Sequence, residues 1–228
     1  MIPKLALIVV LFLANTGFCA NLDLILKPFV RVNRASGICL RSWEIEGKFY
    51  AFVLSAQHVT KGAKDQTKVP ADFIRFDPYG KEISSIQLFG RVLESNEPRD
   101  YAILYYETPY LYPACASISY GNNLVIGEDV FATGAPNLQN YWVSKGIISS
   151  LLSKNLAHHI GHSAGIYFGS SGGPLFNKDG VLIGVNVRLS SGPESRRGEA
   201  ITYLGFSVPL QEIYEHLGVT KRRNYFGL

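Results

Sequence analysis

The segment Gly169–Leu175 has the sequence GSSGGPL. Its serine is a candidate nucleophile, which would need partner residues from elsewhere in the chain. A serine nucleophile needs a tight backbone that exposes its side chain, and N–H groups that converge on the oxygen of an attacked carbonyl. Glycines on both sides of Ser171 permit such a backbone and leave room for a substrate. An ordinary Gly/Ser loop has the same composition, so the prediction depends on partner residues elsewhere.

Two other segments offer the partners that an attacking serine requires. His58 follows the apolar run 48–54, and Asp100 precedes the apolar run 101–106. Serine attack needs a base, and the base needs an acid that fixes its tautomer. A lone His or Asp at such a place is usually structural. The three together predict a nucleophile, a base and an orienting acid at Ser171, His58 and Asp100.

Short runs of β-branched, aromatic and other apolar residues predict many short strands. One helix is expected over 209–217, because Pro209 suits a first helical turn and Gly218 suits a cap. The segment 107–120 contains two prolines and no clear periodicity, which is typical of a linker. Many strands, few helices and a central linker predict an all-β protein of two packed barrels. The expected strands are 29–32, 37–41, 48–54, 86–92, 101–106, 129–133, 141–150, 165–167, 181–187 and 205–208.

Composition argues for a folded protein without a nucleic-acid partner. The 228 residues are 47% hydrophobic and 18% charged, which argues against disorder. The formal net charge is +4, too small to indicate nucleic-acid binding. The dense basic run Lys221–Arg223 is predicted to be a solvated tail.

The N-terminus has the features of a secretory signal peptide. Lys4 precedes the apolar run 5–14 and a small-residue exit near Ala20, and about ten apolar residues are too few to span a bilayer. We therefore predict a cleavable signal over 1–20, a secreted or periplasmic location, and no stable membrane insertion after cleavage. The alternative is a buried first element of the domain. In an oxidising compartment, Cys39 and Cys115 are expected to form one disulfide or two buried thiols.

The segments around the three residues resemble those of trypsin-like serine proteases. SAQHV at 55–59 is similar to their histidine motif, RDYAIL at 99–104 to their aspartate motif, and 169–175 to their serine motif, in the same chain order. Gln57 and Ser170 depart from the family, which usually has a small residue and an Asn or Asp there. Further similarity to the HtrA/DegP group extends the resemblance from about Gly37 to Leu217. No PDZ domain is expected, because eleven residues follow Leu217. The additional similar segments are 36–40, 130–136, 146–149, 184–187 and 205–209.

The resemblance implies a fold and a reaction. The fold is two six-stranded Greek-key β-barrels with a short C-terminal helix: a first barrel over 21–110, a linker over 111–120 and a second barrel over 121–228. The reaction is serine endopeptidase hydrolysis through an acyl-enzyme, with the N–H groups of Gly169 and Ser171 as the oxyanion hole. A protein or peptide substrate is expected, and no metal or organic cofactor.

The resemblance also implies a substrate pocket. Gly165 falls at its base, where trypsins carry an acid, and Ile166 and Val187 line its wall. An apolar pocket without an acid favours a small or medium aliphatic residue at the cleavage site. Arg188 lies in the strand that pairs with the substrate backbone, where it either favours nearby acidic side chains or is solvated.

Three alternatives remain at this stage. The pattern Gly169-x-Ser171-x-Gly173 also fits an esterase elbow, which requires a strand–turn–helix context. His158, His159 and His162 have a spacing compatible with zinc, although they lie in a predicted loop. The third is a catalytically silent protease fold that serves as a binding module, although such a module has no chemical need for an intact triad.

Overall fold

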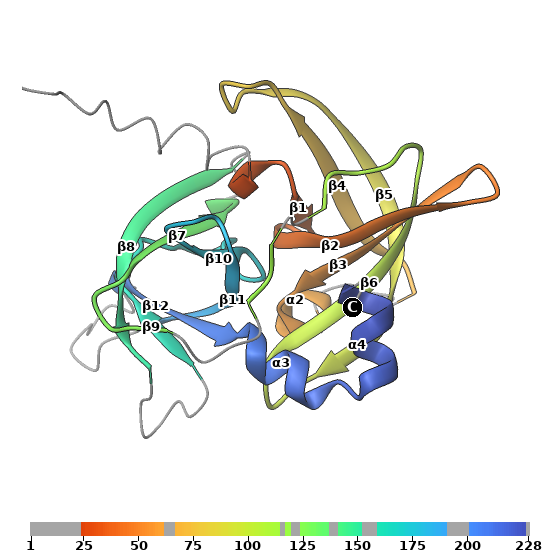
Figure 1. Cartoon of the computed structure of the whole chain (residues 1–228). Helices are drawn as coiled ribbons and strands as arrows, with labels where there is room; N and C mark the ends of the chain where they lie inside the picture. The colour runs from red at the N-terminus through yellow and green to blue at the C-terminus, as the bar shows by residue number, and fades with distance from the viewer. Residues whose placement is uncertain are drawn as a thin grey trace, which may run out of the picture.

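The computed structural model describes residues 24–61, 67–114, 117–119, 124–136, 141–151, 159–190 and 201–226. Within these ranges, twelve strands close into two antiparallel β-barrels of six strands each, which lie side by side (Figure 1). This confirms the predicted fold class.

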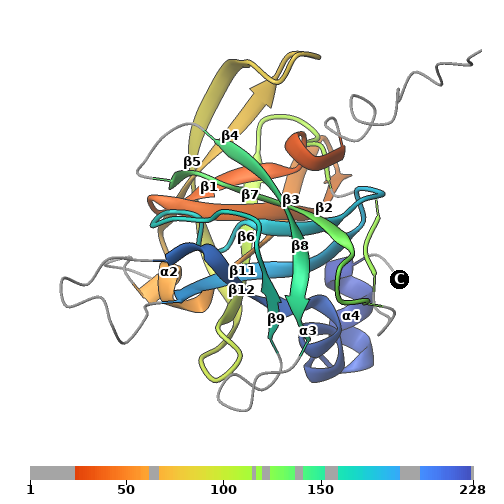
Figure 2. The same cartoon turned by 90° about the vertical axis from the view of Figure 1, so that its left-hand side faces the viewer.

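The first barrel has the strand order β1-β2-β3-β6-β5-β4 and is closed by pairing of β1 with β4. The β4–β5 hairpin extends well beyond the barrel wall (Figure 2). The strands are β1 (Phe29–Val32), β2 (Ala35–Ile45), β3 (Lys48–Ser55), β4 (Val69–Phe76), β5 (Glu82–Asn96) and β6 (Tyr101–Thr108).

The second barrel has the order β10-β11-β12-β9-β8-β7 and is closed by pairing of β10 with β7. Its core is continuous with that of the first barrel, because Phe131, Phe176 and Val185 belong to the same buried cluster as Val53 and Leu104. The strands are β7 (Asp129–Gly134), β8 (Trp142–Ser150), β9 (Ile160–His162), β10 (Pro174–Asn177), β11 (Leu182–Ser190) and β12 (Ile201–Pro209).

Two strands and one segment differ from the sequence prediction. Strands β4 and β9 were not predicted, since β4 contains Pro70 and two charges and β9 has three residues. The predicted strand 165–167 is irregular. Its backbone leaves the ladder after β9, because the Gly165 carbonyl accepts a bond from the Ser144 hydroxyl (2.6 Å) and the Tyr167 N–H donates to Ser170 Oγ (3.2 Å).

The C-terminal region contains the predicted helix and a second one. Helix α3 (Leu210–His216) follows β12, and α4 (Val219–Phe226) packs beside the first barrel (Figure 1). The basic run is therefore not a free solvated tail. Arg222 Nε donates to the carbonyls of Tyr214 (2.5 Å) and Leu217 (2.7 Å), which are left without helical partners at the end of α3. Lys221 forms an ion pair with Glu94.

The segment between the barrels is anchored by one tyrosine. Tyr112 is 2% exposed, and its hydroxyl lies 2.7 Å from the carbonyls of Phe29 and Ile74, which belong to β1 and β4. Cys39 is buried in β2. Cys115 lies outside the described residues, so both alternatives, one disulfide or two buried thiols, stay predictions. Residues 1–20 also lie outside them, and no described helix is long and apolar enough to cross a membrane.

A buried histidine lies in the core of the second barrel. His162 Nε2 is 3.1 Å from Ser207 Oγ, which donates to Asn186 Oδ1 (2.8 Å). Because the one hydroxyl proton goes to Asn186, His162 donates from Nε2 to the Ser207 oxygen. The ring also lies directly against Gly205, where a Cβ would come within 2.3 Å of Cε1. Burial lowers the pKa of His162 to about 4.

This arrangement bears on the zinc alternative. His162 uses Nε2 within the core, and His158 lies outside the described residues. No group of three His, Cys, Asp or Glu side chains in the described part of the chain is arranged to hold a metal ion.

We predict that His162 lowers the free energy of unfolding of this protein in mild acid. Between its pKa of about 4 in the folded state and about 6.5 in the unfolded chain, the unfolded state binds the extra proton. The free energy of unfolding should therefore be unaffected above about pH 6.5 and should fall by on the order of 3 kcal/mol as the pH drops towards 4. Urea unfolding across this range, with wild type beside His162→Asn, measures the effect. Parallel profiles for the two proteins would contradict it.

Candidate active site

His58 and Asp100 contact each other through two hydrogen bonds. His58 lies in the short helix α2 (Gln57–Lys61), immediately after β3. Its ring Nδ1 is 2.7 Å from Asp100 Oδ2, and its backbone N–H donates to Asp100 Oδ1 (3.0 Å). The Asp100 carboxylate therefore fixes both the ring and the backbone of His58. This contact selects the tautomer with a proton on Nδ1, which leaves Nε2 as a proton acceptor.

Asp100 lies in a strained turn between β5 and β6. Its backbone φ is +52°, a left-handed conformation that Asp tolerates better than most residues. Two hydrogen bonds hold the turn: the Asp100 N–H donates to the Glu97 carbonyl (3.2 Å), and the Arg99 N–H donates to Asn96 Oδ1 (2.8 Å).

The Ser171 loop packs against the chain just before His58. Gly172 has a φ of +83°, and a Cβ there would lie 2.1 Å from the Ser36 carbonyl oxygen and 2.2 Å from Ser55 Oγ. Only glycine fits this contact, so the residue after Ser171 lies directly against the end of β3. No hydrogen bond joins Ser171 to the His58 ring in the part of the chain that the structure describes. Such bonds are often long without substrate.

Ser36 connects the two barrels at this point. No sequence motif predicted a functional role for it. It is fully buried at the start of β2. Its hydroxyl donates to the Gly169 carbonyl (2.7 Å) and accepts from the Ala135 N–H (2.8 Å). Its N–H donates to the Ser171 carbonyl (2.9 Å), and its carbonyl accepts from Ser55 Oγ (2.7 Å). The signal for it in the sequence was a serine at the start of the mostly apolar run 35–40.

The contacts of Ser36 use carbonyls of the Ser171 loop and leave two of its backbone N–H groups without an acceptor among the described hydrogen bonds. The carbonyls of Gly169 and Ser171 are both bonded to Ser36. Among the described hydrogen bonds, neither the Gly169 N–H nor the Ser171 N–H has an acceptor. Gly169 has a φ of +98°, a conformation that needs glycine.

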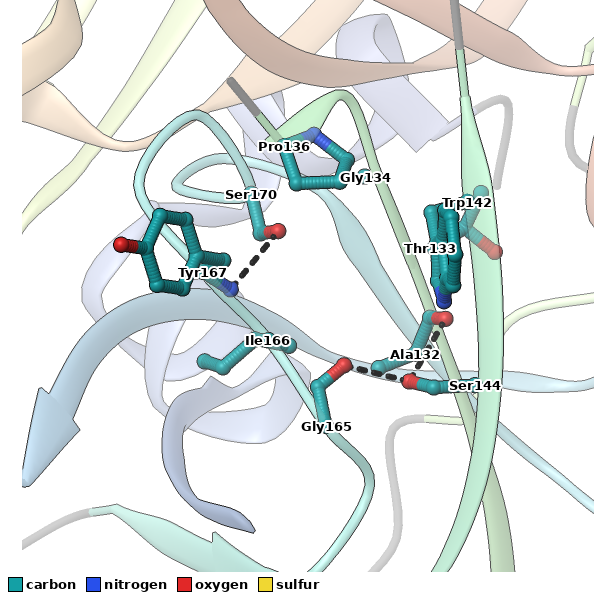
Figure 3. A pocket seen from close by; sticks show the side chains of 10 residues that line it. All are labelled: Ala132, Thr133, Gly134, Pro136, Trp142, Ser144, Gly165, Ile166, Tyr167 and Ser170. Carbon is teal, nitrogen blue, oxygen red and sulfur yellow. Dashed lines mark hydrogen bonds between the residues drawn. The ribbon is translucent and has the colours of Figure 1, made fainter. Parts of the chain in front are cut away.

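A pocket of about 330 Å³ lies between strands β7 and β8 and the segment 165–170 (Figure 3). Of the four predicted specificity residues, Gly165 and Ile166 line it. Val187 is buried in β11 and Arg188 is exposed, and neither is among the lining residues. The other lining residues are Ala132, Thr133, Gly134, Pro136, Trp142, Ser144, Tyr167 and Ser170.

The chain after Ser171 does not match an esterase elbow. That elbow leads from a strand into a helix. Here the turn leads into strand β10, which pairs with β11 and β7.

Comparisons with known proteins agree with this fold. The chain is 26% identical to protease Do-like 1, chloroplastic, of Arabidopsis thaliana, over 75% of this chain and 36% of that protein. It is 28% identical to a probable periplasmic serine endoprotease DegP-like of Hahella chejuensis, over 70% of this chain and 31% of that protein. The chain thus spans about a third of the length of these curated relatives.

Solved structures show the same fold. The MamO protease domain from Magnetospirillum magneticum superposes with a TM-score of 0.65 at 22% identity, covering 86% of this chain and 99% of that one. The HtrA-type protease AlgW with decapeptide gives a TM-score of 0.59 at 24% identity, covering 80% of this chain and 50% of that one.

A family model for the trypsin-like peptidase domain matches residues 35–185. The match includes His58, Asp100 and Ser171 and extends over well more than half of the 228 residues. The resemblance expected from the sequence motifs is confirmed, and the chain belongs to the family of trypsin-like peptidase domains.

Proposed function

We propose that this chain is an exported serine endopeptidase in which Ser171 is the nucleophile, His58 the general base and Asp100 the orienting acid. The observation that carries the proposal is the double contact between Asp100 and His58, beside a glycine-rich loop pressed against the end of β3. Membership of a peptidase family and relatives named as serine endoproteases support it.

The proposed reaction proceeds in two steps. Ser171 Oγ attacks the carbonyl carbon of a peptide, and His58 Nε2 takes the hydroxyl proton. His58 then gives this proton to the leaving amine, so that an acyl-enzyme forms, and water releases the acyl group by the same route. Asp100 keeps the imidazole oriented and stabilises its protonated form.

The oxyanion that forms in each step needs fixed donors. The N–H groups of Gly169 and Ser171 suit this role, because Ser36 occupies the carbonyls of the same two residues. Loss of one such donor typically lowers the rate by about 10²–10³-fold. Ser36 thereby acts as a positioning residue for the oxyanion hole.

The proposed substrate is a protein or peptide with a small or medium aliphatic residue at the cleavage site. Gly165 carries no acidic side chain, and Ile166 and Ala132, which also line the pocket, are apolar and buried. AlgW has been solved with a decapeptide, which supports a peptide as the substrate class. Export agrees with the periplasmic location named for a DegP-like relative.

Labelling by a fluorophosphonate tests the nucleophile. We expect rapid labelling of the mature wild type, none in Ser171→Ala, and a loss of several orders of magnitude in His58→Ala, because the serine would lack its base. Ser84→Ala, at an exposed serine of β5, should label like wild type. A folded wild type that does not label would favour the silent binding module.

A chromogenic peptide series tests the specificity. Val or Ala at the cleavage site should give the highest kcat/KM, because an apolar pocket has no partner for a buried charge. The measurement compares Val, Ala, Leu, Phe, Glu, Lys and Arg in one peptide background. A clear preference for Arg would refute the proposed pocket.

The Ser36→Ala variant tests the positioning of the loop. It leaves the buried Gly169 carbonyl and Ala135 N–H without their partner, which should lower the free energy of unfolding by about 1–3 kcal/mol. We also expect fluorophosphonate labelling to slow about tenfold or more.

Ser42→Ala is the matched control for this test. Ser42 is also a serine of β2 with two hydrogen bonds, to the Tyr50 carbonyl and from the Tyr112 N–H. It should lose stability without losing labelling rate. Equal labelling by the two variants would remove Ser36 from the mechanism.

A further inference from the structure

We propose that His216 is a positioning residue for the reaction: from helix α3 it holds both ends of the turn that carries Asp100. This role rests on the proposed function. We call the contacts of His216 with Asn96 and Tyr101 the His216 clamp.

The clamp joins the last residue of β5 to the first residue of β6. Asn96 and Tyr101 are paired in the β-ladder, and the turn 97–100 lies between them. His216 Nε2 is 3.0 Å from Asn96 Nδ2, and His216 Nδ1 is 2.5 Å from the Tyr101 hydroxyl. The rings of His216 and Tyr101 meet edge-on, with their centroids 5.9 Å apart. One imidazole thus spans both residues from which the turn projects.

The backbone N–H of Arg99 determines which atoms of the clamp donate and which accept. The Arg99 N–H can only donate, so the Asn96 atom that it meets at 2.8 Å is the amide oxygen. The Asn96 NH₂ group therefore faces His216 and donates to Nε2. A neutral imidazole that accepts at Nε2 carries its proton on Nδ1, and this proton is donated to the Tyr101 oxygen.

Tyr101 is a rigid support for this bond. Its side chain is fully buried, and burial, followed by the nearby Glu94 carboxylate, raises the pKa of its phenol to about 12. The hydroxyl therefore stays protonated at neutral pH.

Besides the hydrogen bonds within the turn, two ion contacts reach it from outside, and both are weaker restraints than the clamp. Lys61 and Glu97 form an ion pair with side chains 48% and 71% exposed, and exposed pairs contribute about 0–1 kcal/mol. Arg99 approaches Glu212 of α3 at 3.7 Å, beyond a normal hydrogen bond. Of these contacts from outside the turn, the clamp is thus the one best able to support the left-handed backbone conformation of Asp100.

Because His216 lies on helix α3, the His216 clamp links the two barrels. Leu210 and Ile213 are fully buried and fix α3 directly after β12 of the second barrel. The nucleophile loop belongs to the same barrel. His216 therefore sets the position of an acid in the first barrel relative to a serine in the second.

Two variants test the clamp. In His216→Ala and Tyr101→Phe we expect fluorophosphonate labelling to slow about ten- to a hundred-fold, because small displacements of catalytic groups cost rates of this size. The double variant should be no slower than His216→Ala, since His216→Ala already removes the bond to the Tyr101 hydroxyl that Tyr101→Phe deletes. Glu215→Ala is the matched control, because this exposed neighbour on α3 contacts the Gln211 side chain and not the turn.

A second readout does not need activity. In a Ser171→Ala background, the downfield NMR signal of the His58 Nδ1 proton reports its bond to Asp100. We expect it to shift or broaden in His216→Ala and to stay unchanged in Glu215→Ala. Thermal unfolding checks that each variant is folded, and Tyr101→Phe carries the test if His216→Ala is not.

The outcomes separate the two proposals. A wild-type labelling rate and an unchanged His58 signal in both variants would overturn the clamp alone, as would an equal effect of Glu215→Ala. A wild type that does not label would overturn the proposed function, and the NMR signal would still decide whether His216 positions Asp100.

Discussion

Ser36 joins the two barrels by hydrogen bonds, and the geometry of the Ser171 loop depends on these bonds. A hydroxyl, an N–H and a carbonyl of one buried residue in β2 bind Gly169, Ser171, Ala135 and Ser55. Because buried polar groups are costly to leave unpaired, these four contacts admit essentially one relative placement of the loop and the end of β3. The close approach of Gly172 follows from that placement.

The acid side of the site depends on a different constraint. Asp100 has a backbone conformation that few residues adopt, and both of its carboxylate oxygens bind His58. A turn of this kind needs external support. Helix α3 provides it from outside the first barrel, so that each barrel contributes a contact on which the other barrel's part of the site depends.

Local sequence patterns predicted the parts of this structure that local chemistry determines. The motifs around His58, Asp100 and Ser171 identified the family, and short runs of β-branched, aromatic and other apolar residues identified most strands. The apolar run 165–167 was wrongly predicted to be a strand, because hydrogen bonds to the side chains of Ser144 and Ser170 keep it out of the β-ladder. Helix α4 was missed because its support comes from distant residues such as Glu94 and Phe52. Ser36 and His216 were missed for the same reason, since the partners of Ser36 in the other barrel and the partners of His216 are distant in the sequence.

The place of α3 along the chain has a consequence for biosynthesis. Ribosomes make proteins from the N-terminus, so the three residues proposed for the chemistry are all synthesised before residue 216. On the proposed role of His216, a nascent chain that already carries its nucleophile, base and acid would still lack the support for Asp100. Proteolytic competence would therefore arise late, once β12 and α3 have emerged and docked.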